Sequence, residues 1–141
     1  MNRMGNVLKG YRAAGLQEVV ESASPHALIR MMMEGALDRI ASAKGCMERG
    51  AIAEKGAQIG LVISIIDGLR VSLDRKAGGE LATNLDSLYD YMMHRLFEAN
   101  VRNEPAYLDE VAGLLRQVKD AWNAIPEEFH GARPAATAAA Q

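Results

Sequence analysis

Residues 84–100 read NLDSLYDYMMHRLFEAN, and their apolar positions follow the repeat of an α-helix. Apolar side chains recur at intervals of three and four residues, which places them on the face that a helix turns toward a core. These core positions are Leu85, Leu88, Tyr89, Met92, Leu96 and Ala99. At about 100° per residue, Met93 and Phe97 widen the stripe until apolar residues cover roughly half of the circumference. We therefore expect this helix to contact a partner as well as a core.

Two segments before it show the same repeat. The first starts at Ser24 and Pro25, an N-cap followed by a residue suited to the first helical turn, and it ends at Gly50. Its core face holds Ile29, Met32, Met33, Ala36, Ile40, Ala43 and Met47. The second runs from about Ala51 to Leu73. Its core face holds Ile52, Ile59, Val62, Ile63, Ile66, Leu69 and Leu73.

The chain then breaks at residues 76–79, and the third helix is expected from about Glu80 to Arg102. A turn at Asn103, Glu104 and Pro105, with Asn103 as the expected N-cap, leads into a fourth helix. The core face of this last helix holds Leu108, Val111, Leu115, Val118, Trp122 and Ile125.

Four helices of similar length joined by short connections run antiparallel to their neighbours. The sequence therefore predicts an all-α fold, an antiparallel up-down four-helix bundle over residues 24–125. Residues 1–23 are expected to form an N-terminal arm. Residues 126–141 are expected to be a disordered, Ala-rich C-terminal tail, because they contain little to bury.

Charge and composition narrow the possible partners and compartments. The formal net charge is −2 with both signs interspersed, so no basic stripe favours nucleic acid. No apolar run reaches the roughly 18 residues of a membrane span, and charges and glycines interrupt residues 1–12 where a signal peptide needs an apolar core. The single Cys46 cannot form an internal disulfide. We expect a cytoplasmic protein without membrane insertion.

No arrangement of reactive residues predicts catalysis, a metal or a cofactor. The only Glu-x-x-His pair is Glu127 and His130, which lies in the expected tail and not on two bundle helices. His94 lies on the polar side of its helix, as a phosphoryl-accepting histidine of a four-helix bundle would, but no Lys-Gly follows it. Histidine phosphotransfer is therefore kept only as an alternative that requires phosphorylation of His94. We expect a binding protein.

The second helix shares the surplus of apolar surface. Leu61 and Ile65 lie well round from the Ile59, Val62 and Ile66 stripe. Interior glycines also point to a special contact on this helix. Each lowers helix stability by about 1 kcal/mol relative to alanine, so another interaction has to offset the loss. They include Gly56, Gly60 and Gly68. A shallow groove that admits a partner backbone and tight packing within the bundle both explain them.

Several short motifs in sequence order resemble the flagellin-specific export chaperone family (FliS). They are Ser24-Pro25-His26 with Leu28-Ile29, Gly35-Ala36-Leu37, Leu69 with Leu73-Asp74, Gly79-Glu80, Asn84-Leu85, Leu88-Tyr89-Asp90-Tyr91-Met92, Ala99-Asn100, Glu110-Val111 and Ala121-Trp122. The resemblance extends from about Tyr11 to Trp122. It implies a cytoplasmic chaperone that binds the C-terminal segment of flagellin, prevents its premature polymerisation and delivers it to the flagellar export gate.

The proposed site residues follow from this resemblance and from the surplus apolar surface. The expected flagellin contacts are Leu61, Ile65, Gly68, Tyr89, Met93 and Phe97. Leu61 and Ile65 are expected to share one groove with Met93 and Phe97. The resemblance also implies that the arm contacts the cytoplasmic domain of the export gate through Val7, Leu8 and Tyr11. A role for Tyr11 as a simple tether of the arm is the alternative.

Two departures from the family pattern affect the groove. Met33 stands where an aromatic residue is common, and residues 59–62 are more apolar than usual. These changes favour a wider groove. The other function consistent with the residues is a bundle adaptor that binds amphipathic helices of another secreted or regulatory protein. The exposed apolar surface is consistent with a monomer or a weak homodimer.

Overall fold

The computed structural model describes residues 23–129, and this part of the chain is helical without strands. The elements are α3 (Pro25–Arg49), α4 (Ile52–Val71), α5 (Arg75–Arg102), α6 (Pro105–Asn123) and the short 3-10 helix η2 (Glu127–Phe129). The predicted all-α fold is confirmed. The expectations for the arm, including Val7, Leu8 and Tyr11, and for the tail beyond residue 129 lie outside the described residues.

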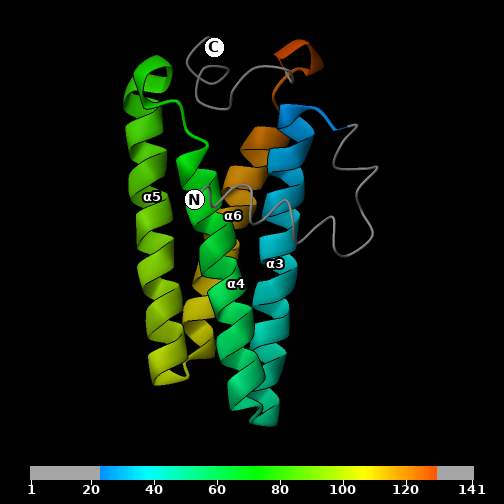
Figure 1. Cartoon of the computed structure of the whole chain (residues 1–141), viewed down its shortest axis with the longest axis vertical. Coiled ribbons are helices and arrows are strands. Elements are labelled where there is room, and N and C mark those ends of the chain that lie inside the picture. The colour runs from blue at the N-terminus through cyan, green and yellow to red at the C-terminus, as the bar shows by residue number, and fades with distance from the viewer. Residues whose placement is uncertain (1–22, 130–141) are drawn as a thin grey trace.

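The four long helices form a ring in which each contacts two neighbours. Helix α4 packs between α3 and α5, and α6 packs between α5 and α3. Successive helices run in opposite directions, so the chain passes up and down the bundle (Figure 1). This is the predicted up-down topology. The start of α3, the end of α4, the start of α5 and the end of α6 therefore meet at one end of the bundle.

The ends of the helices follow from local sequence chemistry. The Oγ of Ser24 accepts a hydrogen bond from the backbone N–H of Ala27 at 3.1 Å, and Gly50 ends α3 in the left-handed region with φ 71°. Asp74 caps α5 in the same way, through a 3.0 Å bond from the Ala77 N–H. Helix α3 thus begins and ends where the sequence predicts.

Three predictions about helix ends need correction. Helix α4 ends at Val71, and one helical turn at Arg75–Gly78 precedes the segment expected from Glu80. Gly79 joins the two with φ 52° and ψ −130°, a conformation that suits glycine, and this kink is the break that the sequence indicated. Asn103 does not cap α6. It ends α5 in the left-handed region, and the Glu104 side chain accepts a hydrogen bond from the Ala106 N–H.

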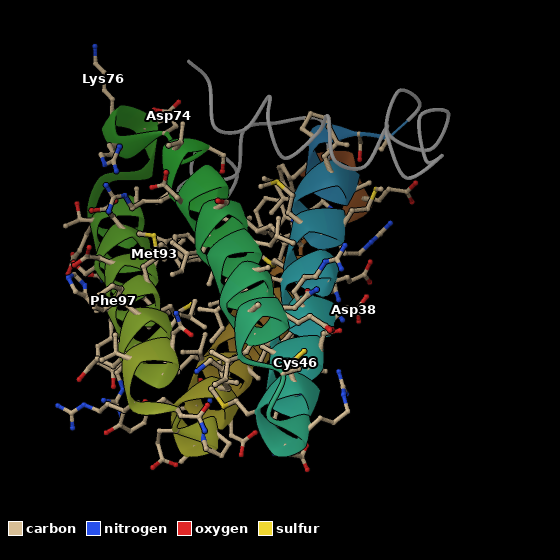
Figure 2. All side chains as sticks on the ribbon, turned by 60° about the horizontal axis from the view of Figure 1, so that its bottom comes forward. Asp38, Cys46, Asp74, Lys76, Met93 and Phe97 are labelled. Atoms are coloured by element: carbon tan, nitrogen blue, oxygen red, sulfur yellow. The ribbon has the colours of Figure 1, made fainter. Side chains whose placement is uncertain are left out.

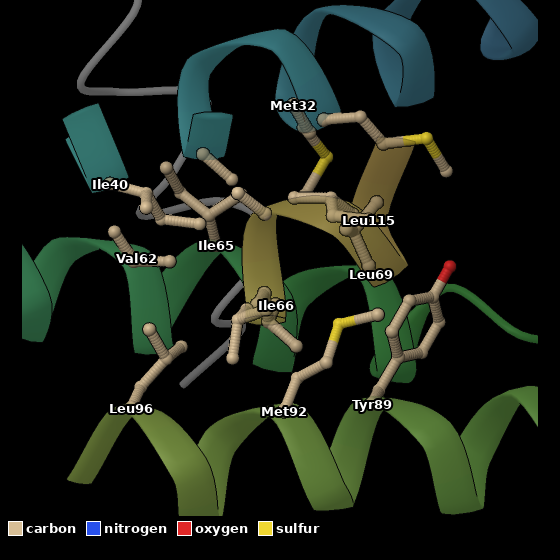
Figure 3. Packing of buried hydrophobic residues seen from close by; sticks show 14 of the residues in the cluster. Met32, Ile40, Val62, Ile65, Ile66, Leu69, Tyr89, Met92, Leu96 and Leu115 are labelled. Atoms are coloured by element: carbon tan, nitrogen blue, oxygen red, sulfur yellow. The ribbon is translucent and has the colours of Figure 1, made fainter. Parts of the chain in front are cut away.

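The core lies along the axis between the four helices. The large side chains that are completely buried are Met32, Met33, Ile59, Val62, Ile66, Leu69, Met92, Leu96, Leu108, Val111 and Leu115. All of them belong to the predicted core faces, and Figure 3 shows several packed between α3, α4, α5 and α6. Ile52 is the exception among the predictions. It is the first residue of α4 and is 74% exposed, because no neighbouring helix covers this end of the helix.

Two buried polar contacts join the helix ends. The Nε2 of His26 donates to the carbonyl oxygen of Trp122 at 2.7 Å, while the indole Nε1 of Trp122 donates to the carbonyl oxygen of His26 at 2.9 Å. At the opposite end the Nζ of Lys55 donates to the carbonyl oxygen of Asn100 and to the Oδ1 of Asn103, each at 3.0 Å. The first contact holds α3 to α6, and the second holds α4 to α5.

Candidate functional site

An apolar cavity of about 370 Å³, here called the end pocket, opens where the ends of the four helices meet. Helices α5 and α6 supply most of its lining. The partly exposed apolar residues of the lining are Leu81, Leu85, Leu88, Leu114, Val118, Ala121 and Ile125. Its buried residues are Ile29, Met33, Leu69, Leu73, Tyr89 and Trp122. Only Ser72 and Gln117 add polar side chains.

The volume of the end pocket limits what can enter it. Its volume lies at the lower end of the usual range for ligand cavities, and its mouth is open to solvent. It can therefore hold apolar side chains that project from a partner.

Tyr89 lies at the inner side of the end pocket. Its ring belongs to the core and is only 3% exposed. Burial raises the pKa of the Tyr89 hydroxyl well above its ordinary value, because the surroundings disfavour a phenolate. The residue thus contributes a neutral apolar surface to the pocket. It is both a core residue and the one predicted contact residue that lines this cavity.

A second apolar surface lies on the side of the bundle between α4 and α5. Phe97 is 63% exposed, and Met93 is partly buried against the core one turn away on the same helix (Figure 2). Asn100 shares their face and lies 4.0 Å from a Cβ built on Gly56 of α4. A Cβ built on Gly60, one turn further along α4, would meet nothing within 4 Å. Met93, Phe97 and Gly60 are therefore called the α4–α5 surface.

The prediction that Leu61 and Ile65 share one groove with Met93 and Phe97 is wrong. Ile65 is buried, 8% exposed, and lies on the side of α4 that faces Ile40 of α3 (Figure 3). Leu61 is 47% exposed and lies one turn from Gln58, which accepts a hydrogen bond from Arg39 of α3. Both residues therefore face α3, away from the α4–α5 surface. Helix α4 is apolar on two sides because it packs between two helices.

Gly68 is the remaining predicted contact residue. It lies inside α4 and is buried. Its position seven residues after Leu61 puts it on the same face of the helix, since seven residues nearly complete two turns. It lies apart from the lining of the end pocket. The six predicted contact residues are thus divided among three surfaces.

A cluster of charged and aromatic side chains joins α5 to α6 directly below the end pocket. Glu110 of α6 accepts hydrogen bonds from the hydroxyl of Tyr91 at 2.6 Å and from the Nε of Arg95 at 2.7 Å. The guanidinium of Arg95 also lies 3.8 Å from the centre of the Tyr107 ring. We call Tyr91, Arg95, Tyr107 and Glu110 the clasp.

The electrostatics of the clasp follow from these contacts. The hydrogen bond from Tyr91 and that from Arg95 lower the pKa of the Glu110 carboxyl. The same carboxylate raises the pKa of the Tyr91 hydroxyl and that of the Arg95 guanidinium, chiefly through these hydrogen bonds. Near neutral pH the clasp therefore contains the Glu110 carboxylate, the Arg95 guanidinium and the neutral Tyr91 phenol.

The remaining features of the described residues concern metal binding, His94 and membrane crossing. Within residues 23–129 no group of His, Cys, Asp and Glu is arranged to hold a metal ion. His94 is exposed, and its Nδ1 lies 2.9 Å from the carbonyl oxygen of Asp90 on its own helix. None of the helices from α3 to α6 combines the length and apolar composition that crossing a bilayer requires.

The end pocket and the clasp were not predicted from the sequence. Leu85, Leu88 and Val118 were correctly placed on apolar faces, but the pocket arises because these faces do not fully meet. The available signal was the apolar pair Leu114 and Leu115, which widens the stripe of the fourth helix as Met92 and Met93 widen that of the third. The clasp depends on the register between two helices, which a single sequence does not reveal.

Comparison with known proteins identifies the relatives of this fold and surface. Residues 7–128 match the family described as flagellar protein FliS. The flagellar secretion chaperone FliSB of Pseudomonas aeruginosa is 51% identical over 118 residues, which cover 84% of this chain and 94% of that protein. The flagellar secretion chaperone FliS of Salmonella typhimurium is 44% identical over 84% of this chain and 88% of its own length. That of Vibrio cholerae is 39% identical over 90% and 93%.

Proposed function

Because the chain belongs to the FliS flagellar protein family, whose curated relatives are flagellar secretion chaperones, we propose that it binds the C-terminal segment of flagellin. It keeps this segment from polymerising prematurely in the cytoplasm and delivers it to the flagellar export gate. It acts by binding alone, without a catalytic step. The observation that supports this most strongly is the end pocket, an open apolar cavity where the ends of the four helices meet.

The chemistry of the end pocket fits an amphipathic segment. Its exposed rim consists of aliphatic side chains, and no charged side chain lines it. Such a surface recognises the spacing of apolar residues in a partner and has little means of recognising one fixed polar group. Leucine, isoleucine or valine side chains on one face of a helix would enter the pocket, while the polar face stays in water.

The α4–α5 surface provides a second contact for the same partner. Phe97 is a large apolar side chain that the bundle leaves 63% exposed, so it offers apolar area that a partner can cover. Met93 beside it is flexible and adapts to different apolar neighbours. Leu61 offers a third contact on the side of α4 that faces α3. We propose that flagellin covers Phe97 and Met93 and that Tyr89 contributes through the wall of the end pocket.

Binding would prevent polymerisation because it covers the apolar residues of the flagellin segment, which are then unavailable to other flagellin subunits. A segment that is disordered when free and helical when bound loses conformational entropy, and this ordering costs roughly 2–5 kcal/mol. The cost moderates the affinity, so the segment can be released without nucleotide hydrolysis. Delivery is proposed to use the N-terminal arm, with Val7, Leu8 and Tyr11 in contact with the cytoplasmic domain of the export gate.

One binding experiment separates this function from its main alternative. The chain is mixed with intact flagellin and with flagellin that lacks its C-terminal segment, and each affinity is measured by isothermal titration calorimetry. We expect binding of the intact protein only. Equal binding of both would contradict the chaperone function as stated and would favour a bundle adaptor for amphipathic helices of another secreted or regulatory protein.

A further inference from the structure

The clasp lies on the same seam between α5 and α6 as the end pocket. On α5, Tyr91 follows the pocket residue Leu88 by three positions, and on α6, Glu110 precedes the pocket residue Leu114 by four. Because the two helices are antiparallel, the clasp lies about one turn below the pocket on both sides. The seam is therefore closed by polar contacts in its lower half and open in its upper half.

The contacts of α5 differ on its two sides. Toward α4, Arg70 pairs with Asp86 at 3.4 Å and with Asp90 at 3.5 Å, beside the pocket-lining stretch of α5. Toward α6, the side-chain hydrogen bonds and ion pairs within residues 75–123 all end on Glu110. Within these residues, the polar side-chain contacts between α5 and α6 are thus confined to the clasp, whereas the position of α5 on α4 has separate polar contacts.

The geometry of the clasp gives it more rigidity than an ordinary surface ion pair. Arg95 is held by the carboxylate of Glu110 and by the ring of Tyr107, and its side chain is only 24% exposed. Tyr91 adds a short hydrogen bond to the other carboxylate oxygen, and the centre of its ring lies 5.9 Å from the Cζ of Arg95. A planar guanidinium that is stacked and hydrogen-bonded keeps one orientation.

We propose that Tyr91, Arg95 and Glu110 are positioning residues that set the width of the end pocket and thereby the size of the partner groups that it admits. This rests on the proposed function of the pocket as a flagellin site. With the clasp formed, the pocket keeps its volume of about 370 Å³. When the clasp is lost, α5 moves away from α6 and the pocket accepts bulkier groups.

The test compares a clasp variant with a matched control on the adjacent residue. The double variant Tyr91→Phe/Glu110→Gln removes the hydroxyl and the charge of the clasp and keeps the shape of both side chains. The control Asp109→Asn breaks the exposed ion pair between Asp109 and Lys44, which joins α6 to α3 at 2.9 Å. Urea unfolding of both variants establishes that each remains folded.

The first readout is the distance between α5 and α6. Spin labels are placed at Ser87→Cys and Asp120→Cys in a Cys46→Ala background, and the distance distribution is measured by pulsed electron paramagnetic resonance. We expect the clasp variant to lengthen and broaden the distribution by a few ångströms, and the control to leave it unchanged. An unchanged distance in the clasp variant, or the same change in the control, would overturn the proposal.

The second readout is the size of the group that the end pocket admits. Two fluorescent probes are titrated, 8-anilinonaphthalene-1-sulfonate and its bulkier dimer bis-ANS, and the ratio of their affinities is compared. We expect the ratio to shift several-fold toward the larger probe in the clasp variant alone, and a constant ratio would contradict the proposal. Neither readout uses flagellin, so a failure to bind flagellin would remove the proposed function and leave the clasp intact.

Discussion

His26 and Trp122 exchange two hydrogen bonds, one in each direction between a side chain and a backbone carbonyl. Their rings stack with centres 4.6 Å apart and planes inclined by 9°. The two residues lie at the first turn of α3 and the last turn of α6, and Trp122 also lines the end pocket. This contact therefore fixes Trp122, which lies in one wall of the proposed binding site, to the first turn of α3.

Replacement of Trp122 tests this connection. Trp122→Phe keeps an aromatic ring but removes the indole donor, which leaves the buried carbonyl oxygen of His26 without that hydrogen bond. We expect the free energy of unfolding to fall by about 1 kcal/mol, the usual net contribution of one hydrogen bond. Urea denaturation measures the change. A loss no larger than that of an exposed substitution such as Asn123→Ala would show that the contact adds little.

Lys55 is expected to stabilise the end of α5. Its side chain is 6% exposed and donates to the Asn100 carbonyl and to the Asn103 side chain, so its charge lies beside the C-terminal carbonyls of that helix. Lys55→Met should lower stability by about 1–3 kcal/mol, because it removes a charged hydrogen-bond donor from the end of α5.

The matched control for Lys55 is Lys119→Met. Lys119 is more exposed and pairs with Glu34 only at 3.9 Å. Exposed pairs of this kind contribute about 0–1 kcal/mol. Equal melting temperatures for the Lys55→Met and Lys119→Met variants would contradict a capping role for Lys55.

Ile65 and Phe97 should respond differently to the same change. Ile65→Asp places a carboxylate in the core and should destabilise the bundle by more than about 3 kcal/mol. Phe97→Asp changes an exposed side chain, so it should leave melting unchanged and weaken flagellin binding. Circular dichroism and calorimetry separate the two effects. Ile52→Asp, at a 74% exposed position, is the control for Phe97. Unfolding of the Phe97 variant would show that this side chain belongs to the core.

The prediction for Ile65 shows where reasoning from the sequence reaches its limit. The helical repeat places a residue at an angle on its own helix, so the core faces of the four helices were predicted largely correctly, with Ile52 wrongly included and Ile65 wrongly left out. The repeat does not say which neighbour lies at that angle. Ile65 and Met93 were therefore assigned to one groove, although Ile65 lies on the side of α4 that faces α3 (Figure 3) and Met93 lies on the side of α5 that faces α4 (Figure 2).

The missed features have a similar physical origin. The end pocket exists because α5 and α6 separate near Leu81 and Leu114, and separation depends on the register and spacing of helices. Asn103 has the residue type of an N-cap but adopts the left-handed conformation that ends α5, with φ 52°. Asparagine is suited to both positions, so its type alone could not decide between them.

The clasp predicts a specific pH dependence. Hydrogen bonds from Tyr91 and Arg95 lower the pKa of Glu110 below its ordinary value of 4.5. The carboxylate therefore contributes stability above that value, and the contribution is lost as the pH falls through the lower pKa of the folded state. The difference in melting temperature between the wild-type chain and Glu110→Gln should be constant near neutral pH and should shrink in acid. A difference that grows in acid would exclude a stabilising carboxylate.

The most direct test of the end pocket as the flagellin site compares two substitutions at equally exposed residues. Leu81 lines the pocket and is 41% exposed, whereas Val71 lies outside its lining and is 46% exposed. The affinity of Leu81→Glu and of Val71→Glu for intact flagellin is measured by isothermal titration calorimetry, with melting curves for both. We predict that Leu81→Glu weakens binding at least tenfold, about 1.4 kcal/mol, and that Val71→Glu binds like the wild type. Wild-type affinity of a folded Leu81→Glu variant would contradict the account.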